Sequence, residues 1–467
     1  MSDNEITSEE LESFIQKKIP LLILDLRDPD KFMEGHIEGS ANSKFASMQQ
    51  KQAVMSRLPK NYKIVLVDEN GSESSQNVTL LGRFGFDACF LKEGIKSWTK
   101  DLIKSSQETA ISNENLWNSL KNNEDVFLLD VREPMEFSEF KIPGAVNFPL
   151  SDLFSEKNFE KIPKNKKIVT ICSHGNRSMV ATFALAQKGF EASSLDGGMS
   201  RWNQVLNANI AIKHEDLIII QVEKVGKGCL SHIVGSNGEA IVIDPTYPPS
   251  KYLEFAEKEG LIIRKVIDTH QHADHVSAAL QLSKLANADL NFSAREEYNI
   301  ESTKAKDGDL IPIGGKQIRV MHTPGHTAGS MTYVVDEIYA FVGDTLFVES
   351  IGRPDLRDKA EEFAVELHET LHNKLLNLPP NCKIFPTHHG EGVKPTENGI
   401  FYTTPEIAKN LSLLDLNKDE FIKKVVNMAV PRPMNYSMVI KVNKGTIPIT
   451  EEQVPDLEMG PNRCSVQ

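Results

Sequence analysis

Side chains that bind metal ions crowd into one short segment of this chain. The run Thr269–His275 (THQHADH) places three histidines and one aspartate within six consecutive positions. Neutral imidazole nitrogens and carboxylate oxygens are ligands that suit Zn, Fe or Mn. One histidine is typical of a solvated turn, but four ligand-type residues in six positions indicate a metal site.

The elements around this run are expected to aim its side chains at one space. The apolar stretch 261–267 predicts a strand, and a strand that ends in a turn can direct His270 and His272 to the same side. Residues 276–280 predict a helix. We therefore expect Asp274 and His275 to open that helix and to face the same space.

More ligand-type residues occur later in the chain. His326, Asp344 and the pair His388-His389 each come shortly after an apolar stretch that predicts a strand. These stretches are 317–321, 338–342 and 382–385. Loops that follow the strands of one sheet converge on the edge of that sheet, so the histidines and the aspartate are expected to meet there.

This combined pattern resembles the metallo-β-lactamase superfamily, and the resemblance implies an αββα sandwich over residues 215–400. The resemblance also implies seven metal-ligand positions, namely His270, His272, Asp274, His275, His326, Asp344 and His388. His389 matches none of these positions and is interpreted as an ordinary loop residue.

The resemblance leaves two metal arrangements open. Two zinc ions could share the seven ligands with Asp344 as a bridge, as in glyoxalase II-like thioester hydrolases, which make hydroxide from metal-bound water. One iron(II) ion per chain could instead bind His270, His326 and Asp344, a face that leaves positions for substrate and dioxygen. The four other positions would then hold hydrogen-bonding groups around the ligands. Ligand identity alone does not decide between the two.

The first half of the chain is an internal repeat. Residues 25–29 match residues 130–134 at an offset of 105, and Trp98 matches Trp202 at an offset of 104. Each copy alternates short apolar strands with helical segments. This alternation predicts two α/β domains with mainly parallel sheets covered on both faces.

A cysteine in the second copy occupies a reactive position. Cys172 follows the predicted strand 167–171 and precedes a helix predicted over 179–188. A thiol at a helix N-terminus meets unpaired N–H groups and the positive end of the helix dipole, which both stabilise a thiolate. By contrast, Cys89, Cys229 and Cys382 are interpreted as small buried apolar residues.

The Cys172 loop and the Asp-x-Arg-x-x-x-Phe motif resemble the rhodanese family of sulfurtransferases. The resemblance implies that Cys172 takes up sulfane sulfur as a persulfide and that Arg177 holds the anionic donor or acceptor. The loop residues that would cradle the persulfide are Ser173, His174, Gly175 and Asn176. In the first copy Asp68 stands at the position of Cys172 and Glu73 at that of Arg177, which predicts a non-catalytic domain.

The sequence Gly352-Arg353-Pro354-Asp355 resembles the Gly-Arg-x-Asp loop of persulfide dioxygenases, with Arg353 as a substrate-binding residue. Persulfide dioxygenases fused to rhodanese domains are a known group. The resemblance implies oxidation of a thiol persulfide by dioxygen to sulfite and free thiol, in sulfide or sulfane-sulfur metabolism. The coupled rhodanese site would act on thiosulfate and persulfides. The carrier thiol stays open between glutathione, coenzyme A and others.

Two other function classes are weighed against this reading. One is a dinuclear zinc thioester hydrolase fused to a sulfurtransferase, which metal content would distinguish from an iron enzyme. The other is a non-enzymatic sulfur-relay protein whose metal domain is only a scaffold. The full set of ligand-type residues speaks against the scaffold.

Composition restricts the setting and the partners. The net charge of −13 without a basic stripe argues against nucleic-acid and anionic-membrane partners, and no apolar run approaches the ~20 residues of a membrane span. Five scattered cysteines and the absence of a signal-peptide pattern at the N-terminus favour a reducing cytoplasm. A homo-oligomer stays open.

The expected organisation is a non-catalytic rhodanese-like domain, a catalytic one, the metal domain and a C-terminal extension. Their expected bounds are 8–104, 109–208, 215–400 and 401–467. The extension should contain an amphipathic helix over 419–426 and pack back on the metal domain. Cys464 lies in a terminus that is expected to fray, and it is assigned no role.

Overall fold

The computed structural model describes residues 4–17, 19–44, 48–104, 110–154, 156–354, 359–390, 392–428, 435–460 and 464–465. The chain divides into two compact units, Met1–Trp202 and Asn203–Gln467. None of the described helices combines the length and the apolar character needed to cross a membrane.

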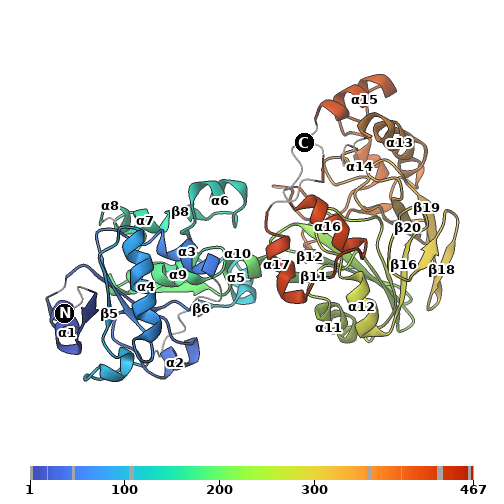
Figure 1. Cartoon of the computed structure of the whole chain (residues 1–467). Helices are drawn as coiled ribbons and strands as arrows, with labels where there is room; N and C mark the ends of the chain where they lie inside the picture. The colour runs from blue at the N-terminus through green and yellow to red at the C-terminus, as the bar shows by residue number, and fades with distance from the viewer. Residues whose placement is uncertain are drawn as a thin grey trace. The chain divides into compact units, whose positions relative to one another are not determined.

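The first unit contains two five-stranded parallel sheets of the same topology, β1-β5-β4-β2-β3 and β6-β10-β9-β7-β8 (Figure 1). The strands of the first sheet are β1 (Glu5–Ile6), β2 (Leu21–Asp25), β3 (Ser40–Asn42), β4 (Lys63–Val67) and β5 (Ala88–Leu91). Those of the second are β6 (Ala110–Ile111), β7 (Val126–Asp130), β8 (Val146–Asn147), β9 (Lys167–Ile171) and β10 (Ala192–Leu195). The repeat and the α/β class predicted from the sequence are confirmed.

Helices cover both faces of each sheet, which is why the central strands are continuous apolar runs rather than alternating ones. In β4 and β9 every residue after the first lysine is buried. The helices of the first copy are α1 (Ser8–Gln16), α2 (Pro29–Glu34), α3 (Met48–Met55) and α4 (Ser72–Arg83). Those of the second are α5 (Asn113–Lys121), α6 (Pro134–Glu139), α7 (Leu150–Leu153), α8 (Glu156–Phe159), α9 (Asn176–Gln187) and α10 (Gly198–Trp202).

The two copies share one hydrophobic cluster. It joins Leu66 and Phe86 of the first copy to Phe159 and Phe190 of the second. The first copy therefore packs apolar surface against the second, and this role does not require the first copy to be catalytic.

The second unit is a sandwich of two sheets, β11 to β17 in sequence order and β18 to β22 in sequence order. The strands of the larger sheet are β11 (Leu206–Lys213), β12 (Ile218–Lys224), β13 (Cys229–Ser236), β14 (Glu239–Ile243), β15 (Ile262–Ile267), β16 (Asp289–Ser293) and β17 (Thr303–Ala305). Those of the smaller sheet are β18 (Leu310–Ile313), β19 (Lys316–His322), β20 (Met331–Val335), β21 (Tyr339–Phe341) and β22 (Lys383–Phe385).

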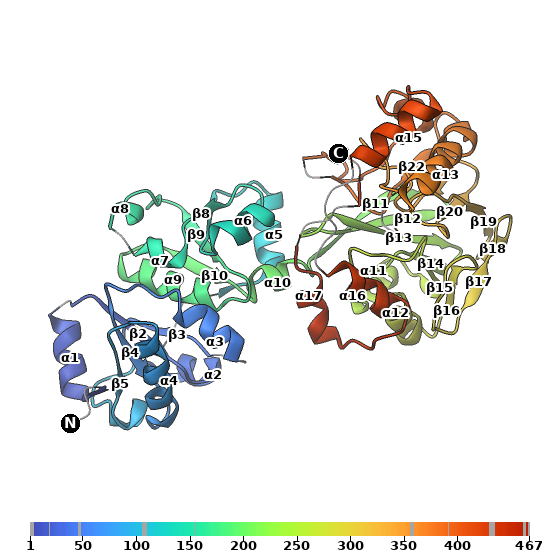
Figure 2. The same cartoon turned by 45° about the horizontal axis from the view of Figure 1, so that its top comes forward.

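The core of the sandwich lies between the inner faces of the two sheets, where Ile219 and Ile241 meet Ile318, Tyr333 and Phe341. The outer face of the larger sheet is covered by α11 (Ser250–Lys258) and α12 (Ala279–Ala286). The outer face of the smaller sheet is covered by α13 (Ala360–Asn373) and α15 (Lys418–Asn427). These layers form the expected αββα arrangement (Figure 2).

The C-terminal part of the chain returns to the sandwich. It contains α14 (Pro405–Ala408), α16 (Tyr436–Asn443) and α17 (Val454–Leu457). Val454 packs with Tyr247, Val276 and Ala278 of the metal-site side of the sandwich. The expected helix over 419–426 corresponds to α15, and the expected packing of the tail on this domain is observed.

Candidate functional site

Segments that follow four strands converge in the second unit. His270 follows β15, His326 follows β19, Asp344 follows β21 and His388 follows β22. All four side chains are at most 2% exposed. The predicted convergence of these residues is therefore observed, but not at the edge of one sheet: β15 belongs to the larger sheet, and β19, β21 and β22 belong to the smaller one.

Three of these residues face one point. One ligand atom from each of His270, His326 and Asp344 lies within 4.8 Å of the other two. The Oδ2 atom of Asp344 is 3.7 Å from Nε2 of His270 and 3.5 Å from Nε2 of His326. This spacing leaves room for a single ion among the three atoms.

Hydrogen bonds on the far side of each group fix its orientation. Nδ1 of His270 lies 2.9 Å from the Thr269 hydroxyl, and Nδ1 of His326 lies 2.9 Å from the carbonyl oxygen of Arg353. Oδ1 of Asp344 accepts a hydrogen bond of 2.5 Å from the Thr387 hydroxyl. Among the described residues Oδ2 of Asp344 has no hydrogen-bond partner, so two imidazole nitrogens and one carboxylate oxygen stay available to a metal ion.

The protonation states also fit a metal site. Burial lowers the pKa values of His270 and His326, which favours the neutral imidazoles that bind metals. Burial opposes ionisation of Asp344, but the adjacent His388 imidazole and the other histidines outweigh it and lower the pKa of this carboxyl.

His272 lies beside His270 as expected, with ring centroids 4.3 Å apart, but it supplies no atom to the three-residue group. Its Nε2 lies 3.0 Å from Oδ1 of Asp244 and 4.0 Å from Oδ1 of Asp268. Strand alternation does not extend to this residue, because β15 ends at Ile267 and residues 269–278 form an irregular loop. Asp244 follows the adjacent strand β14 and holds Nε2 of the His272 imidazole.

The expected helix over 276–280 begins later than predicted. The first helical residue is Ala279, with Ala278 as its N-cap. Asp274 and His275 therefore lie in the irregular loop and do not open a helix. They still face the site, because the chain folds back on itself there.

A second cluster adjoins the first and contains Cys229, Asp274, His275 and His388. Nε2 of His388 lies 2.8 Å from Oδ2 of Asp274, and Nδ1 of His275 lies 3.1 Å from Oδ1 of Asp274. His388 also places Nδ1 2.6 Å from Oδ1 of Asp344. Both nitrogens of His388 are thus engaged by carboxylates.

Cys229 is part of this polar cluster, so its interpretation as a small apolar residue is wrong. Burial opposes ionisation of its thiol, but the imidazoles of His388 and His275 outweigh burial and lower its pKa to about 6. Cys89 and Cys382 behave as expected of inert buried thiols, because burial raises their pKa values to about 11 and about 12.

Cys464 lies at the metal site, contrary to the expectation that it belongs to a frayed end. Cys464 is 4% exposed, and ligand atoms of Cys464, Asp344 and His388 lie within 4.8 Å of one another. The carbonyl oxygen of Cys464 accepts a hydrogen bond from the backbone N–H of Arg353 at 3.1 Å. No sequence motif predicts this contact, because it joins segments more than a hundred residues apart.

A buried ion pair fastens the same tail. Glu458 and Lys224 are both fully buried, with Nζ 2.5 Å from Oε2. The other carboxylate oxygen of Glu458 accepts a hydrogen bond from the N–H of Val276, next to His275, at 2.8 Å. The pair therefore links the tail to the loop that carries the histidines. Sequence reasoning missed both residues.

Arg353 lies beside the three ligands but is almost fully buried, at 1% exposed. Its carbonyl oxygen orients His326, as described above. Asp355 of the predicted Gly-Arg-x-Asp loop is outside the described residues. His389 stacks on Phe401 with ring centroids 4.1 Å apart, in agreement with its interpretation as an ordinary loop residue.

In the first unit, Cys172 lies where the sequence predicts, between β9 and α9. Its Sγ accepts hydrogen bonds from the N–H of Gly175 at 3.1 Å and from the Ser178 hydroxyl at 3.3 Å. Gly175 has φ +91°, a left-handed conformation that favours glycine. The helix begins at Asn176 rather than at Met179, so the thiol lies directly at its N-terminus.

Arg177 is not free to meet an anion, because Glu136 of α6 holds it. Its two terminal nitrogens each donate a hydrogen bond of 2.8 Å to Glu136. Burial opposes ionisation of Glu136, but the hydrogen bond from Arg177 outweighs it and lowers the carboxyl pKa to about 2. The internal repeat could have revealed this pair. In the first copy Lys31 stands at the position of Glu136 and Glu73 at the position of Arg177, so both charges are reversed.

The corresponding loop of the first copy is filled by its own side chain. The buried carboxylate of Asp68 accepts hydrogen bonds from the backbone N–H groups of Gly71, Glu73 (2.6 Å) and Ser74 (3.0 Å). The loop is still an anion-binding turn. Its anion is a residue of the protein, which leaves no thiol and no vacant site for a substrate anion.

Comparison with known proteins agrees with this architecture. A model of the rhodanese-like domain matches residues 7–101 and 112–205, and a model of the metallo-beta-lactamase superfamily matches residues 226–290 and 293–390. The human protein "Persulfide dioxygenase ETHE1, mitochondrial" is 29% identical over 208 residues, which are 44% of this chain and 78% of that protein.

Two further similarities concern the same half of the chain. The probable polyketide biosynthesis zinc-dependent hydrolase BaeB of Bacillus velezensis is 30% identical over 165 residues, which are 34% of this chain and 71% of that protein. The crystal structure of ETHE1 from Myxococcus xanthus is 25% identical, with a TM-score of 0.45, and covers 49% of this chain and 99% of its own. The chain therefore belongs to the metallo-beta-lactamase superfamily through a domain related to the persulfide dioxygenase ETHE1, and rhodanese-like domains precede that domain.

Proposed function

We propose that the chain is an iron-dependent persulfide dioxygenase with an active rhodanese site at Cys172. The observation that carries the proposal is the set of three buried ligand atoms on His270, His326 and Asp344, a set that does not include His272, whose Nε2 is held by Asp244. Two histidines and one carboxylate with open positions are typical of non-haem iron(II) enzymes that use dioxygen. Relatedness to ETHE1 supports the same activity.

His270, His326 and Asp344 would hold an iron(II) ion, which would supply the chemistry that joins dioxygen to a persulfide. The overall reaction converts a thiol persulfide, dioxygen and water into thiol, sulfite and two protons. The chain's own residues would keep the imidazoles neutral by burial, hold Asp344 ionised and fix the direction of each ligand atom.

At the other site, the N–H of Gly175 and the Ser178 hydroxyl would stabilise Cys172 as a thiolate and then as a persulfide. Thiosulfate would transfer its outer sulfur to the thiolate and leave as sulfite. Sulfite is also the product of the proposed dioxygenase, so the two sites would share a metabolite. Glutathione and coenzyme A are both carrier thiols that fit this scheme.

A dinuclear zinc hydrolase is the second candidate, because Cys229, Asp274, His275 and His388 form a second group with metal-ligand spacing. The relative BaeB, whose name describes a zinc-dependent hydrolase, matches the same domain. Against it, Nε2 of His272 is held by Asp244, and both nitrogens of His388 already contact carboxylates.

The deciding experiment is metal analysis of the purified chain together with an oxygen electrode. We expect one iron per chain and oxygen uptake with glutathione persulfide, with sulfite as the product. Two zinc ions per chain, thioester hydrolysis and no oxygen uptake would overturn the proposal in favour of the hydrolase.

A further inference from the structure

The C-terminal tail of the second unit holds the loop that carries the histidines, through two side chains that the proposed chemistry does not use. Asn443 is the last residue of α16, and Glu458 directly follows α17. Both are buried, at 8% and 1% exposed. Their partners are backbone groups of residues 272–277. These residues belong to the irregular loop 269–278, which is called the metal loop below.

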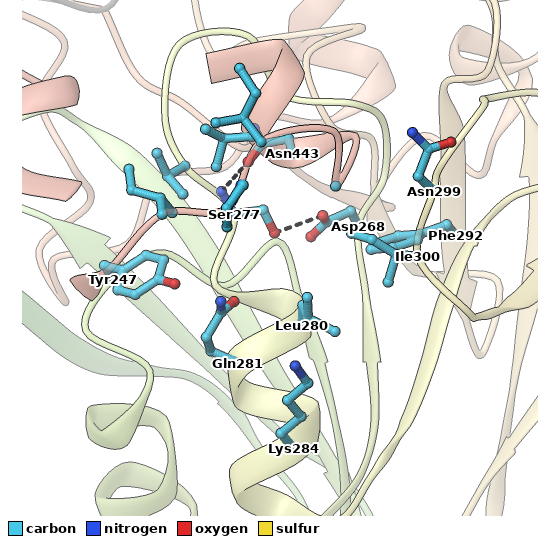
Figure 3. A pocket seen from close by; sticks show the side chains of 16 residues that line it. Tyr247, Asp268, Ser277, Leu280, Gln281, Lys284, Phe292, Asn299, Ile300 and Asn443 are labelled. Carbon is cyan, nitrogen blue, oxygen red and sulfur yellow. Dashed lines mark hydrogen bonds between the residues drawn. The ribbon is translucent and has the colours of Figure 1, made fainter. Parts of the chain in front are cut away.

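Asn443 satisfies three backbone groups of the metal loop at once. Its side-chain amide donates hydrogen bonds to the carbonyl oxygens of His272 at 2.9 Å and His275 at 2.8 Å. Its Oδ1 accepts a hydrogen bond of 2.9 Å from the backbone N–H of Ser277 (Figure 3). Val276 and Ser277 also line a pocket of about 390 Å³, so close packing does not hold this part of the loop on the pocket side. The hydrogen bonds of Asn443 therefore fix its backbone.

Glu458 holds the neighbouring backbone group. Its Oε1 accepts a hydrogen bond of 2.8 Å from the N–H of Val276, and its Oε2 lies 2.5 Å from Nζ of Lys224. Lys224 is the last residue of β12, in the larger sheet. Because both oxygens of the carboxylate are engaged, Glu458 has a fixed orientation, and the N–H of Val276 is anchored to the sheet.

The anchored part of the loop leads to a metal ligand through buried polar contacts. Asp274 and His275 directly precede Val276, and Oδ1 of Asp274 lies 3.1 Å from Nδ1 of His275. Oδ2 of Asp274 lies 2.8 Å from Nε2 of His388, whose Nδ1 lies 2.6 Å from Oδ1 of Asp344. The other oxygen of Asp344 lies 3.7 Å and 3.5 Å from the other two ligand nitrogens. A displacement of the loop at Val276 would therefore change the direction of the Asp344 carboxylate.

We propose that Asn443 and Glu458 are positioning residues of the metal site, which fix the metal loop and, through it, the direction of Asp344. Groups behind the ligands contribute to metal affinity because they orient the ligand atoms before the ion binds. The proposal rests on the three-residue metal site of the proposed function, but neither on the identity of the resident metal nor on the reaction. It predicts that loss of these contacts weakens metal binding in a chain that is otherwise folded.

The first test separates the contact with Val276 from the buried ion pair. Glu458→Gln alone would leave the charge of Lys224 buried without its partner, so both variants also contain Lys224→Met. Glu458→Gln keeps a side-chain oxygen that can accept from Val276, whereas Glu458→Met removes it. The full chain is loaded with cobalt(II), and a chelator competes for the ion. We expect the affinity for cobalt(II) to be roughly tenfold lower in the methionine variant than in the glutamine variant.

Asn443 is tested in the same assay. Asn443→Ala removes all three contacts, and Asn443→Asp removes the two donors but keeps an acceptor for Ser277. Both should bind cobalt(II) roughly tenfold more weakly than the unmodified chain. The matched control is Asn299→Ala, because Asn299 lines the same pocket and its side chain donates to Thr446 rather than to the metal loop. This control should bind cobalt(II) as the unmodified chain does.

A merely structural role of the two residues would give a different result. The variants would lose free energy of unfolding, but their folded fraction would keep the cobalt(II) affinity and the visible absorption spectrum of the unmodified chain. We expect a changed spectrum, because the visible bands of cobalt(II) depend on the geometry of its ligands.

Three outcomes would overturn the proposal. Equal affinities and spectra of the glutamine and methionine variants would refute the role of Glu458, and unchanged values in Asn443→Ala would refute that of Asn443. If the unmodified chain itself binds no cobalt(II), the metal site and the proposal are both wrong. Because the readouts are affinity and absorption, a failed dioxygenase assay would leave this test unaffected.

Discussion

In the first rhodanese-like copy, the carboxylate of Asp68 occupies the anion-binding turn of its own loop. Replacement of Asp68 by alanine should leave this turn free to bind an anion from solution. The carboxylate now accepts three backbone hydrogen bonds inside the protein. Hydrogen bonds to a charged group contribute about 1.5–3 kcal/mol each, and bonds that share one acceptor are not additive. With water entering the space in part, we expect Asp68→Ala to lower the free energy of unfolding by roughly 2–4 kcal/mol.

Sulfate should restore much of that loss, because it can occupy the three vacated N–H groups. A ligand that binds only the folded state stabilises it by about 2.7 kcal/mol at a concentration 100-fold above its Kd. The assay is urea unfolding of the full chain with sodium sulfate or with sodium chloride at equal ionic strength. Hydrogen exchange of peptides from residues 68–83 then locates the effect in the loop and α4.

Two controls separate site binding from the general stabilising effect of sulfate. The unmodified chain has the same Cys172 loop, but Asp68 still occupies the turn of its first copy. The change that sulfate causes in its free energy of unfolding therefore measures all effects of sulfate except binding at the new site. Asp87→Ala removes an exposed carboxylate whose one ion pair among the described residues is with Lys63, and it should cost less than about 1 kcal/mol. If sulfate stabilises Asp68→Ala no more than these two proteins, Asp68 is not the resident anion of the loop.

Three further outcomes follow from the same geometry. Asp344→Ala should abolish iron binding, as measured by metal analysis. His272→Ala should keep most of the iron, with the affinity for iron reduced roughly 10–100-fold. An equal loss of iron in both variants would contradict a three-residue iron site. Cys172→Ser should remove thiosulfate sulfurtransferase activity and leave oxygen uptake with preformed persulfide nearly unchanged; loss of both activities in a folded variant would mean that sulfur must pass through this thiol. Glu136→Gln should free Arg177 and lower KM for thiosulfate severalfold, and an unchanged KM would mean that Arg177 does not contact the anion. In the folded chain the pKa of Glu136 is lowered to about 2, whereas in the unfolded chain it is about 4.3. The ion pair with Arg177 therefore stabilises the fold above about pH 4.3, and this stabilisation is lost as the pH falls towards about 2. Between these pH values, acid should lower the free energy of unfolding of the unmodified chain more than that of Glu136→Gln.

The sequence predicts the rhodanese-like copies well because their information is local and repeated. Matching offsets place Asp68 and Cys172 at the same turn of two sheets that have the same strand order. Strand β9 was predicted with its observed bounds. Glu136 was missed because its contact with Arg177 joins two helices, although the reversed charges in the first copy point to it.

The metal site is predicted only in part. Metal-ligand residues are recognisable from type and spacing. That His270 comes from one sheet of the sandwich and His326 and Asp344 from the other is a property of the packed sheets. Whether a side chain faces the common point depends on the turn after the strand. His272 lies beside His270 as the spacing predicts, but Asp244, which follows another strand, holds its Nε2, and the sequence does not predict this contact.

By itself the sequence determined the domain order, the αββα class, the residues able to bind a metal and the reactive position of Cys172. These follow from apolar periodicity and from chemical groups whose spacing is local. Only the tertiary structure decided that Asp244 holds Nε2 of His272 and that Cys229 and Cys464 come close to the metal ligands. It also decided that Glu458 fastens the tail to the metal loop. Such contacts join segments distant in the chain, and their geometry results from the packing of two sheets and a returning terminus, which no local pattern contains.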